Sequence, residues 1–379
     1  MSPRGHVVIA PDKFKGSLTA TEVAAHVAAG LARTSPGTPL VTVPVADGGD
    51  GTVDAAVACG FARVRTRVSG PTGEPVTAAY AVRDDTAVIE LAEASGLRRL
   101  PGGEPAPLTA SSHGTGELIA AAVAGGAKRI VLGLGGSACT DGGTGMATAL
   151  GARFLDGDGR RLGPGGAELR RLASIEVADL GRLIAGVEVV IARDVDSPLL
   201  GPDGAAAVFS PQKGATAGQV LTLENGLARL ESITRRTFNT WRAKTPGAGA
   251  AGGVGFGAMV FLHAEARPGI GYLLDLLGFT DKLDGARLVI TGEGSLDRQT
   301  LAGKAPTGVA KAAAKRGVPV VAVSGRRSLT GEQLRKARFQ HAYALTDLEP
   351  DPARCMAEAG PLLERLAEAI GRELEAASR

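Results

Sequence analysis

Short apolar runs alternate with polar loops and helix-like segments at both ends of this chain, and this order constrains its fold more than any single motif. Near the start, residues 6–10 form a strand-length apolar run that leads into a polar loop. Thr19 then stands at an N-cap position, with Glu22 three residues later completing a capping box, which predicts a helix to about residue 33. A second strand is predicted at 40–45. Strand, loop, helix and strand in this order are typical of a parallel sheet.

The same order returns near the C-terminus, whereas the middle of the chain is more mixed. The C-terminal part contains a predicted strand at 287–291, a loop at 292–297, a helix around 308–315, a strand at 319–323 and a final helix from about Pro352 to the end. The middle contains a predicted hairpin of strands 76–82 and 86–91, a helix at 117–124, and strands at 129–132 and 187–192. We therefore predict an α/β protein with one discontinuous domain, residues 1–75 plus 270–379, and a mixed α/β domain, residues 76–269, inserted in it.

Composition narrows the functional classes. The 379 residues are long enough for two cores, and 44% of them are hydrophobic. A net charge of +3 and only 3% aromatic residues argue against binding to nucleic acid or to an anionic membrane surface. No apolar run reaches 18 residues, the N-terminus lacks the apolar core of a signal peptide, and the three cysteines form no C-x-x-C pair. We expect a cytoplasmic protein that acts on a small molecule.

The segment GLGGSACTDGGTGM, residues 133–146, follows a predicted strand and leads into a helix-compatible segment. It contains six glycines and a single acid, Asp141. Glycines let backbone N–H groups approach an anion closely, and a helix N-terminus adds favourable partial charge. The segment predicts contact with phosphate.

Charged residues also follow four of the predicted strands. They are Asp12, Lys13 and Lys15 after the first strand, Asp47 and Asp50 after the second, Asp194 and Asp196 after residue 192, and Glu293 and Asp297 after residue 290. Ligands of parallel α/β sheets bind at the carboxyl ends of the strands. Phosphoryl transfer needs cations, a carboxylate that holds a metal ion and a group that orients the acceptor hydroxyl.

Each of these motifs also has a structural interpretation. The glycine-rich segment could be a packing turn, Asp47 could belong to a plain turn, and the acids after the strands could cap turns or helices. The chain lacks a P-loop and the protein-kinase motifs H-R-D and D-F-G. Ala138 replaces the third glycine of a dinucleotide fingerprint, and Cys139 has no histidine near it in sequence. For His113, we favour a structural role, with its hydrogen bonds made within the loop, over contact with a substrate.

Taken in order along nearly the whole chain, the motifs resemble the type I glycerate kinase family. The blocks that carry this resemblance are APDKFKGSLTA at Ala10, PVADGGDGT at Pro44, SSHGTGELI at Ser111, GLGGSACTDGGTGM at Gly133, RDVDSPLLGPDGAA at Arg193, FSPQKGA at Phe209, PGAGAAGGVGFG at Pro246 and TGEGSLDRQTLAGKAP at Thr291. Cys139-Thr140 stands where Thr-Asn is common in the family, and Ser197 stands where Asn is common. These departures leave affinity and nucleotide preference open.

The resemblance implies a kinase that phosphorylates D-glycerate with ATP and Mg²⁺, in glyoxylate and glycerate metabolism. It implies that the discontinuous domain is flavodoxin-like and that the active site lies in a cleft between the domains. The expected product is 2-phosphoglycerate. The alternatives are a glycerate 3-kinase, a non-catalytic sugar-acid-binding protein, and, on the incomplete fingerprint, a nicotinamide-dependent oxidoreductase. No sequence feature indicates the oligomeric state, and a homodimer is left open.

Roles for individual residues follow as hypotheses. Asp194 would orient or deprotonate the acceptor hydroxyl, while Lys13 and Lys15 would neutralise carboxylate or phosphate charge. Asp47 and Glu293 are the candidates for magnesium or hydroxyl contacts. The predicted substrate- or phosphate-binding residues are Ser17, Asp47, Gly48, Gly49, Gly135, Gly136, Ser137, Asp141, Asp297 and Lys304, with the glycines and Ser137 of the 133–146 segment acting through backbone N–H groups.

Overall fold

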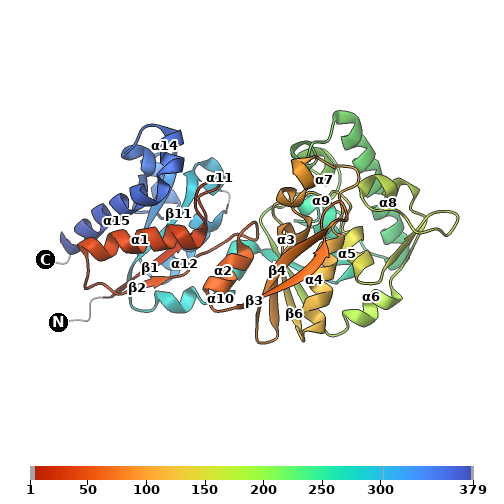
Figure 1. Ribbon diagram of the computed structural model, residues 1–379, viewed down its shortest axis with the longest axis horizontal. Coiled ribbons are helices and arrows are strands. Elements are labelled where there is room, and N and C mark those ends of the chain that lie inside the picture. Colours follow the sequence, from red (N-terminus) through yellow and green to blue (C-terminus); the bar gives the residue numbers. More distant parts are fainter. Residues whose placement is uncertain (1–4, 302, 377–379) are drawn as a thin grey trace. The chain divides into compact units, whose positions relative to one another are not determined.

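The computed structural model of this chain describes residues 5–301 and 303–376. The chain divides into two compact units (Figure 1). The terminal unit comprises the chain up to Asp47, residues 54–60, and the chain from Ile270 onward. The central unit comprises residues 48–53 and 61–269.

A five-stranded sheet forms the centre of the terminal unit, and all its strand pairs are parallel. Its strands are β1 (His6–Pro11), β2 (Leu40–Thr42), β11 (Ala286–Leu296), β12 (Val320–Arg327) and β13 (His341–Ala344). Their spatial order is β2-β1-β11-β12-β13, so counting strands along the chain gives 2-1-3-4-5. This is the order of flavodoxin-like folds, with a topological switch point between β1 and β11. The predicted flavodoxin-like parallel sheet is confirmed.

Helices cover both faces of this sheet. Helix α1 (Ala20–Thr34) packs along α15 (Ala359–Ala376), and the two bury one face together with Val7 and Ile9 of β1 (Figure 1). Val8 points to the opposite face, because side chains alternate along a strand, and α12 (Ala305–Lys315) contacts β1, β11 and β12. The remaining helices with residues in this unit are α2 (Thr52–Ala58), α10 (Gly269–Leu276), α11 (Arg298–Leu301), α13 (Gly331–Lys336) and α14 (Pro352–Ala357).

Local signals in this unit act as predicted, with small changes of boundary. The Thr19 hydroxyl accepts from Glu22 N at 3.2 Å, and Glu22 Oε2 accepts from Thr19 N at 2.8 Å, which completes the capping box. β2 spans Leu40–Thr42, and the N–H groups of Val43 and Val45 continue to donate to the Ile9 and Pro11 carbonyls of β1, at 2.8 and 3.0 Å. The predicted final helix is two helices, α14 and α15, and its last residues, 377–379, lie outside the described residues.

The central unit contains a mixed six-stranded sheet in the order β10-β9-β6-β5-β4-β3. The strands are β3 (Ala62–Ser69), β4 (Pro75–Arg83), β5 (Thr86–Glu90), β6 (Arg129–Gly133), β9 (Glu188–Arg193) and β10 (Glu265–Pro268). β3, β4 and β5 pair antiparallel, which confirms the predicted hairpin, and β5, β6, β9 and β10 pair parallel. A separate antiparallel pair consists of β7 (Arg153–Leu155) and β8 (Ser174–Glu176).

The helices of the central unit pack around an extensive buried core. They are α3 (Leu91–Ser95), α4 (His113–Ala124), α5 (Thr144–Ala149), α6 (Ala178–Leu183), α7 (Ala205–Phe209), α8 (Ala217–Phe238) and α9 (Ala250–Phe261). Short 3₁₀ turns of the two units span Leu97–Arg99, Pro101–Gly103, Gly166–Arg171, Pro211–Lys213, Thr280–Leu283 and Leu345–Asp347. Among the described helices, none is long and apolar enough to cross a membrane.

Two boundaries differ from the sequence expectation. Residues 61–75 were expected with the chain ends, but β3 lies in the central unit because every residue of it pairs with β4. The predicted loop 292–297 is largely strand, because β11 continues to Leu296 beside β12, pairing Glu293 with Ser324. The backbone of Glu293 is therefore fixed by the pairing of β11 with β12.

Candidate active site

Three carboxylates lie together at the carboxyl ends of the strands in the terminal unit. Asp12 follows β1, Asp47 follows the segment after β2, and Glu293 lies on β11 beside the end of β1. Burial, followed by the charge of Asp47, raises the pKa of Asp12 to about 7, with Glu293 adding to the shift and Lys13 opposing it. This group stands at the β1–β11 switch point, where doubly wound sheets bind ligands.

The basic loop after β1 brings two of the predicted residues to the same place. Lys13 is half-buried, and its backbone N–H donates to Asp12 Oδ1 at 2.7 Å, whereas Lys15 is exposed. The Ser17 hydroxyl donates to the Phe14 carbonyl at 3.2 Å within a local turn. The loop therefore places Lys13 beside Asp12 and leaves Lys15 exposed, and the Ser17 hydroxyl has a turn-forming contact.

Two side chains of the terminal unit hold the Glu293 carboxylate. Its Oε1 accepts from Thr300 Oγ1 at 2.5 Å, and its Oε2 lies 3.4 Å from Lys304 Nζ. Burial raises the pKa of Glu293, although the Thr300 hydrogen bond and Lys304 oppose the shift. Asp297 accepts from Gln299 N at 2.8 Å at the start of α11, which is the helix-start contact considered for it from sequence.

The predicted glycines act mainly by letting backbones approach each other in the central unit. A Cβ on Gly48 would lie 2.4 Å from Ala192 O, and one on Gly135 would lie 2.4 Å from Gly49 Cα. The N–H of Gly135 donates to Gly48 O at 3.2 Å. This hydrogen bond joins the glycine-rich segment to the loop at 48–49, and the phosphate contact predicted for Gly135 stays a prediction. Gly136 has a φ of +75° and its carbonyl accepts from Leu97 N at 2.9 Å.

A small cavity in the central unit joins the glycine-rich segment to the end of β9. Its volume is about 110 Å³, and Asp194 lies on its wall together with Gly135, Gly136 and Ser137. The other lining residues are Leu97, Leu134, Val195, Phe209, Gln212, Lys213 and Ala251. Ala251 is left-handed at φ 54°, an arrangement that costs energy for a residue with a Cβ and often marks a functional site. We refer to this space as the Asp194 cavity.

Lys213 is the functional candidate that the residue-by-residue reasoning missed. Its side chain is 2% exposed, and its Nζ donates to Ser137 Oγ at 2.8 Å and to Cys139 O at 2.5 Å. Burial lowers the pKa of Lys213 to about 8. In the sequence, Lys213 belongs to the block FSPQKGA, where a single lysine between an apolar segment and a glycine could have marked it as a candidate.

Glu90 is a second residue that the sequence reasoning missed. Its Oε2 accepts from Gly51 N at 3.0 Å and from Val53 N at 3.3 Å.

Asp141 lies in a fully buried network of hydrogen bonds. It is fully buried, and its carboxylate accepts from Ser112 N at 2.8 Å, Gly143 N at 3.1 Å and Gly145 N at 3.2 Å, with both oxygens also contacting Ser112 Oγ. These bonds tie the glycine-rich segment to the start of α4. This network shapes the loop, and the ligand contact expected at Asp141 stays a prediction.

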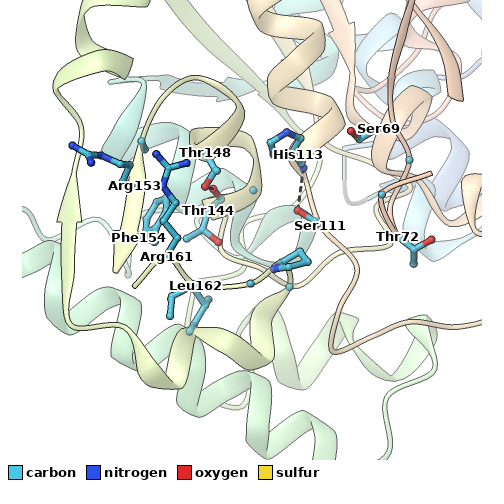
Figure 2. Close-up of a pocket in the computed structure, with 18 residues that line it drawn as sticks. Ser69, Thr72, Ser111, His113, Thr144, Thr148, Arg153, Phe154, Arg161 and Leu162 are labelled. Atoms are coloured by element: carbon cyan, nitrogen blue, oxygen red, sulfur yellow. Dashed lines mark hydrogen bonds between the residues drawn. The ribbon is translucent and has the colours of Figure 1, made fainter. Parts of the chain in front are cut away.

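A second cavity of about 280 Å³ opens elsewhere in the central unit, and Figure 2 shows the side chains around it. His113 lies on its wall, and the His113 N–H donates to Ser111 Oγ at 3.2 Å. Arg153 and Arg161 line the same cavity, and Arg153 is 2.6 Å from Glu176. None of the predicted site residues lines this cavity.

The acids of the terminal unit fit a magnesium ion of the kind that nucleotide enzymes use. Within residues 5–301 and 303–376, no group of three or more His, Cys, Asp or Glu side chains is placed so that it could hold a metal ion by itself. Mg²⁺ commonly takes one or two carboxylates and completes its shell with phosphates and water. A cation beside Asp47 and Glu293 would relieve the repulsion that raises the pKa of Asp12.

Comparison with known proteins finds similarity along nearly the whole chain. The model of the glycerate kinase family matches residues 7–375. A Bacillus subtilis (strain 168) protein named glycerate kinase is 44% identical over 348 residues, which cover 91% of this chain and 90% of the relative. An Escherichia coli (strain K12) protein named glycerate 2-kinase is 42% identical and covers 86% of each chain. A Salmonella typhimurium LT2 crystal structure, described as a glycerate kinase 2, superposes with a TM-score of 0.86 at 38% identity over 99% of each chain. This chain belongs to the glycerate kinase family.

Proposed function

We propose that this protein transfers the γ-phosphoryl group of ATP to the 2-hydroxyl of D-glycerate and releases 2-phosphoglycerate and ADP. Family membership supports the kinase class, and the relative named glycerate 2-kinase supports the position of transfer. The observation that carries the proposal is the Asp194 cavity, where an acid, a buried lysine and a glycine-rich backbone line one space of small-molecule size.

Asp194 is the residue we propose to orient and deprotonate the acceptor hydroxyl. In the proposed step the hydroxyl oxygen forms a bond to the γ-phosphorus while the bond from that phosphorus to the β,γ-bridging oxygen breaks. The hydroxyl proton passes to the Asp194 carboxylate, and ADP leaves with the bridging oxygen. Gly136 and Ser137 would contact the anionic oxygens from the wall of the same cavity.

The terminal unit would supply the charges for the nucleotide. Lys13, Lys15 and Lys304 are proposed to neutralise phosphate or carboxylate charge, and Asp47 and Glu293 to hold Mg²⁺. Mg²⁺ held by these two carboxylates would offset the negative charge of the phosphates during transfer. Ser17, Asp297, Gly48 and Gly49 remain proposed binding residues that act through their positions in these loops.

Two other functions are compatible with the same fold, and the product of the reaction with glycerate and ATP distinguishes them from the proposed one. A glycerate 3-kinase would differ only in which hydroxyl faces Asp194, so the same residues would yield 3-phosphoglycerate. A sugar-acid-binding protein would bind glycerate and leave ATP intact. The acids and lysines at the strand ends favour a kinase, because a sugar-acid-binding protein has no need for carboxylates that hold metal.

Phosphorus NMR of a reaction with D-glycerate, ATP and Mg²⁺ tests the proposal directly. We expect the signal of 2-phosphoglycerate to rise as that of ATP falls. A 3-phosphoglycerate signal would retain the kinase and reject the 2-position, and glycerate binding without any phosphorylated product would favour the binding protein. Asp203→Asn, at an exposed loop residue, is a matched control for Asp194→Asn.

A further inference from the structure

One buried charge in the central unit, the ammonium of Lys213, has no ion-pair partner among the described residues. Lys213 is 2% exposed, yet its hydrogen-bond acceptors are a serine hydroxyl and a backbone carbonyl. No carboxylate lies within ion-pair distance of its Nζ among the described residues of the chain. Burying an ammonium without a paired anion lowers the stability of the folded protein. A stabilising role therefore does not explain the presence of Lys213 at this position.

The neighbouring ionisable groups do not supply the missing charge. Cys139 is buried, and burial raises the pKa of its thiol, so that residue is neutral. Asp141 exerts a favourable charge on Lys213 from a distance, but its oxygens already accept hydrogen bonds from Ser112, Gly143 and Gly145. Asp194 lines the same cavity but forms no ion pair with Lys213 among the described contacts, so an anion from outside the chain can compensate the ammonium.

The ammonium lines a space where such an anion can sit. An ammonium carries three donors, and two of them are used by Ser137 and Cys139. Lys213 lies on the wall of the Asp194 cavity, whose volume of about 110 Å³ far exceeds the ~10–15 Å³ that one water needs. The space suits a group of a few heavy atoms, such as a carboxylate or a phosphoryl group.

We propose that Lys213 is a ligand-binding residue of this enzyme, whose Nζ binds the anionic oxygens of a small group seated in the Asp194 cavity. The proposal rests on the proposed function for the source of that group, which is either the glycerate carboxylate or the γ-phosphate of the nucleotide. Ser137 is then a positioning residue, because it holds the ammonium of Lys213 at the cavity wall.

The lowered pKa of Lys213, about 8, provides a signature that a structural lysine would not give. An anion that pairs with the ammonium stabilises its protonated form and raises its pKa. Binding at pH 8 should therefore take up a fraction of a proton, and affinity should fall as the pH rises above 8, because the unprotonated amine cannot compensate the anion.

Isothermal titration of the full-length protein tests this with two separate probes: D-glycerate alone, and a non-hydrolysable ATP analogue with Mg²⁺. At pH 8, in buffers of different ionisation enthalpy, we expect proton uptake for one probe and at least a tenfold loss of its affinity in Lys213→Met. The affected probe identifies the source of the anion. Lys244→Met, at an exposed lysine of the same unit, should bind both probes as the wild type does.

The outcomes separate this proposal from the proposed function. Wild-type affinity for both probes in a folded Lys213→Met protein overturns the role of Lys213 and leaves the kinase intact. Wild-type protein that binds neither probe overturns both. If Lys213→Met does not fold, proton uptake by the wild type decides alone: its absence with both probes rejects the proposal.

Discussion

Lys213 Nζ donates a 2.8 Å hydrogen bond to Ser137 Oγ across 76 residues of sequence. One partner lies in the glycine-rich segment, and the other ends the 3₁₀ turn Pro211–Lys213 that follows α7. The bond links two segments of the wall of the Asp194 cavity and gives the buried ammonium one of its acceptors. It is the contact through which we expect the two residues to act as a unit.

A double-mutant cycle of Ser137→Ala and Lys213→Met measures that coupling. A hydrogen bond to a charged group contributes roughly 1.5–3 kcal/mol, so Ser137→Ala should lower kcat/KM for glycerate by about tenfold or more. In the Lys213→Met background the same change should cost less than threefold, because its partner is gone. Equal losses in both backgrounds would show that the two residues act independently.

Asp194→Asn tests the proposed base. A positioned acid or base contributes roughly 10²–10⁴ in rate, so kcat should fall by that factor while KM for glycerate changes little. Steady-state kinetics with a coupled ADP assay measures both. Asp203→Asn should retain wild-type kinetics, and a kcat within threefold of wild type in Asp194→Asn would remove Asp194 from this role.

Asp141→Ala should affect stability before it affects chemistry. Removing the carboxylate leaves the buried N–H groups of Ser112, Gly143 and Gly145 without an acceptor, and each such loss costs roughly 1–3 kcal/mol. We expect the free energy of unfolding in urea to fall by about 3 kcal/mol or more. Asp158→Ala, at an exposed surface pair, should change it by less than about 0.5 kcal/mol. Unchanged stability with weaker glycerate binding would restore the ligand role expected from sequence.

Asp12→Asn should stabilise the metal-free protein at alkaline pH. The pKa of Asp12 is about 7 in the folded state and near 3.8 in the unfolded state, so above pH 7 the fold carries a charge it disfavours. As the pH falls from 7 to 4, Asp12 becomes protonated in the folded state while it is still charged in the unfolded state. The free energy of unfolding of the wild type therefore rises relative to that of the variant. The stabilising effect of Asp12→Asn should reach up to about 4 kcal/mol at pH 8 and vanish below about pH 4.

Urea unfolding at pH 4, 6 and 8 without divalent cations measures this difference, with Asp281→Asn at an exposed acid as the control. A pH-independent difference between Asp12→Asn and wild type would mean that Asp12 titrates normally. Added Mg²⁺ should oppose the trend, since a bound cation favours the charged carboxylate.

Local patterns in the sequence determined the elements that depend on near neighbours. The Thr19–Glu22 capping box, the hairpin of β4 and β5 and the parallel arrangement of the chain ends all follow from residue types within a few positions of each other. The acids after β1 and β9 could be selected as site candidates for the same reason, because the end of a parallel strand is predictable from a short apolar run.

Only the tertiary structure decided what each polar residue contacts. Glycines at 48 and 135 were expected to bind phosphate, yet their backbones pack against Ala192 and Gly49, which lie far away in sequence. Asp141 became a buried acceptor for three separate N–H groups, and Lys213 became a candidate because a cavity and a serine 76 residues away surround it. Burial and hydrogen-bond partners arise from contacts between distant segments, and a local pattern carries no information about them. The sequence by itself determined the family and which polar residues follow the strands, whereas long-range packing decided which charges are buried and which line a cavity.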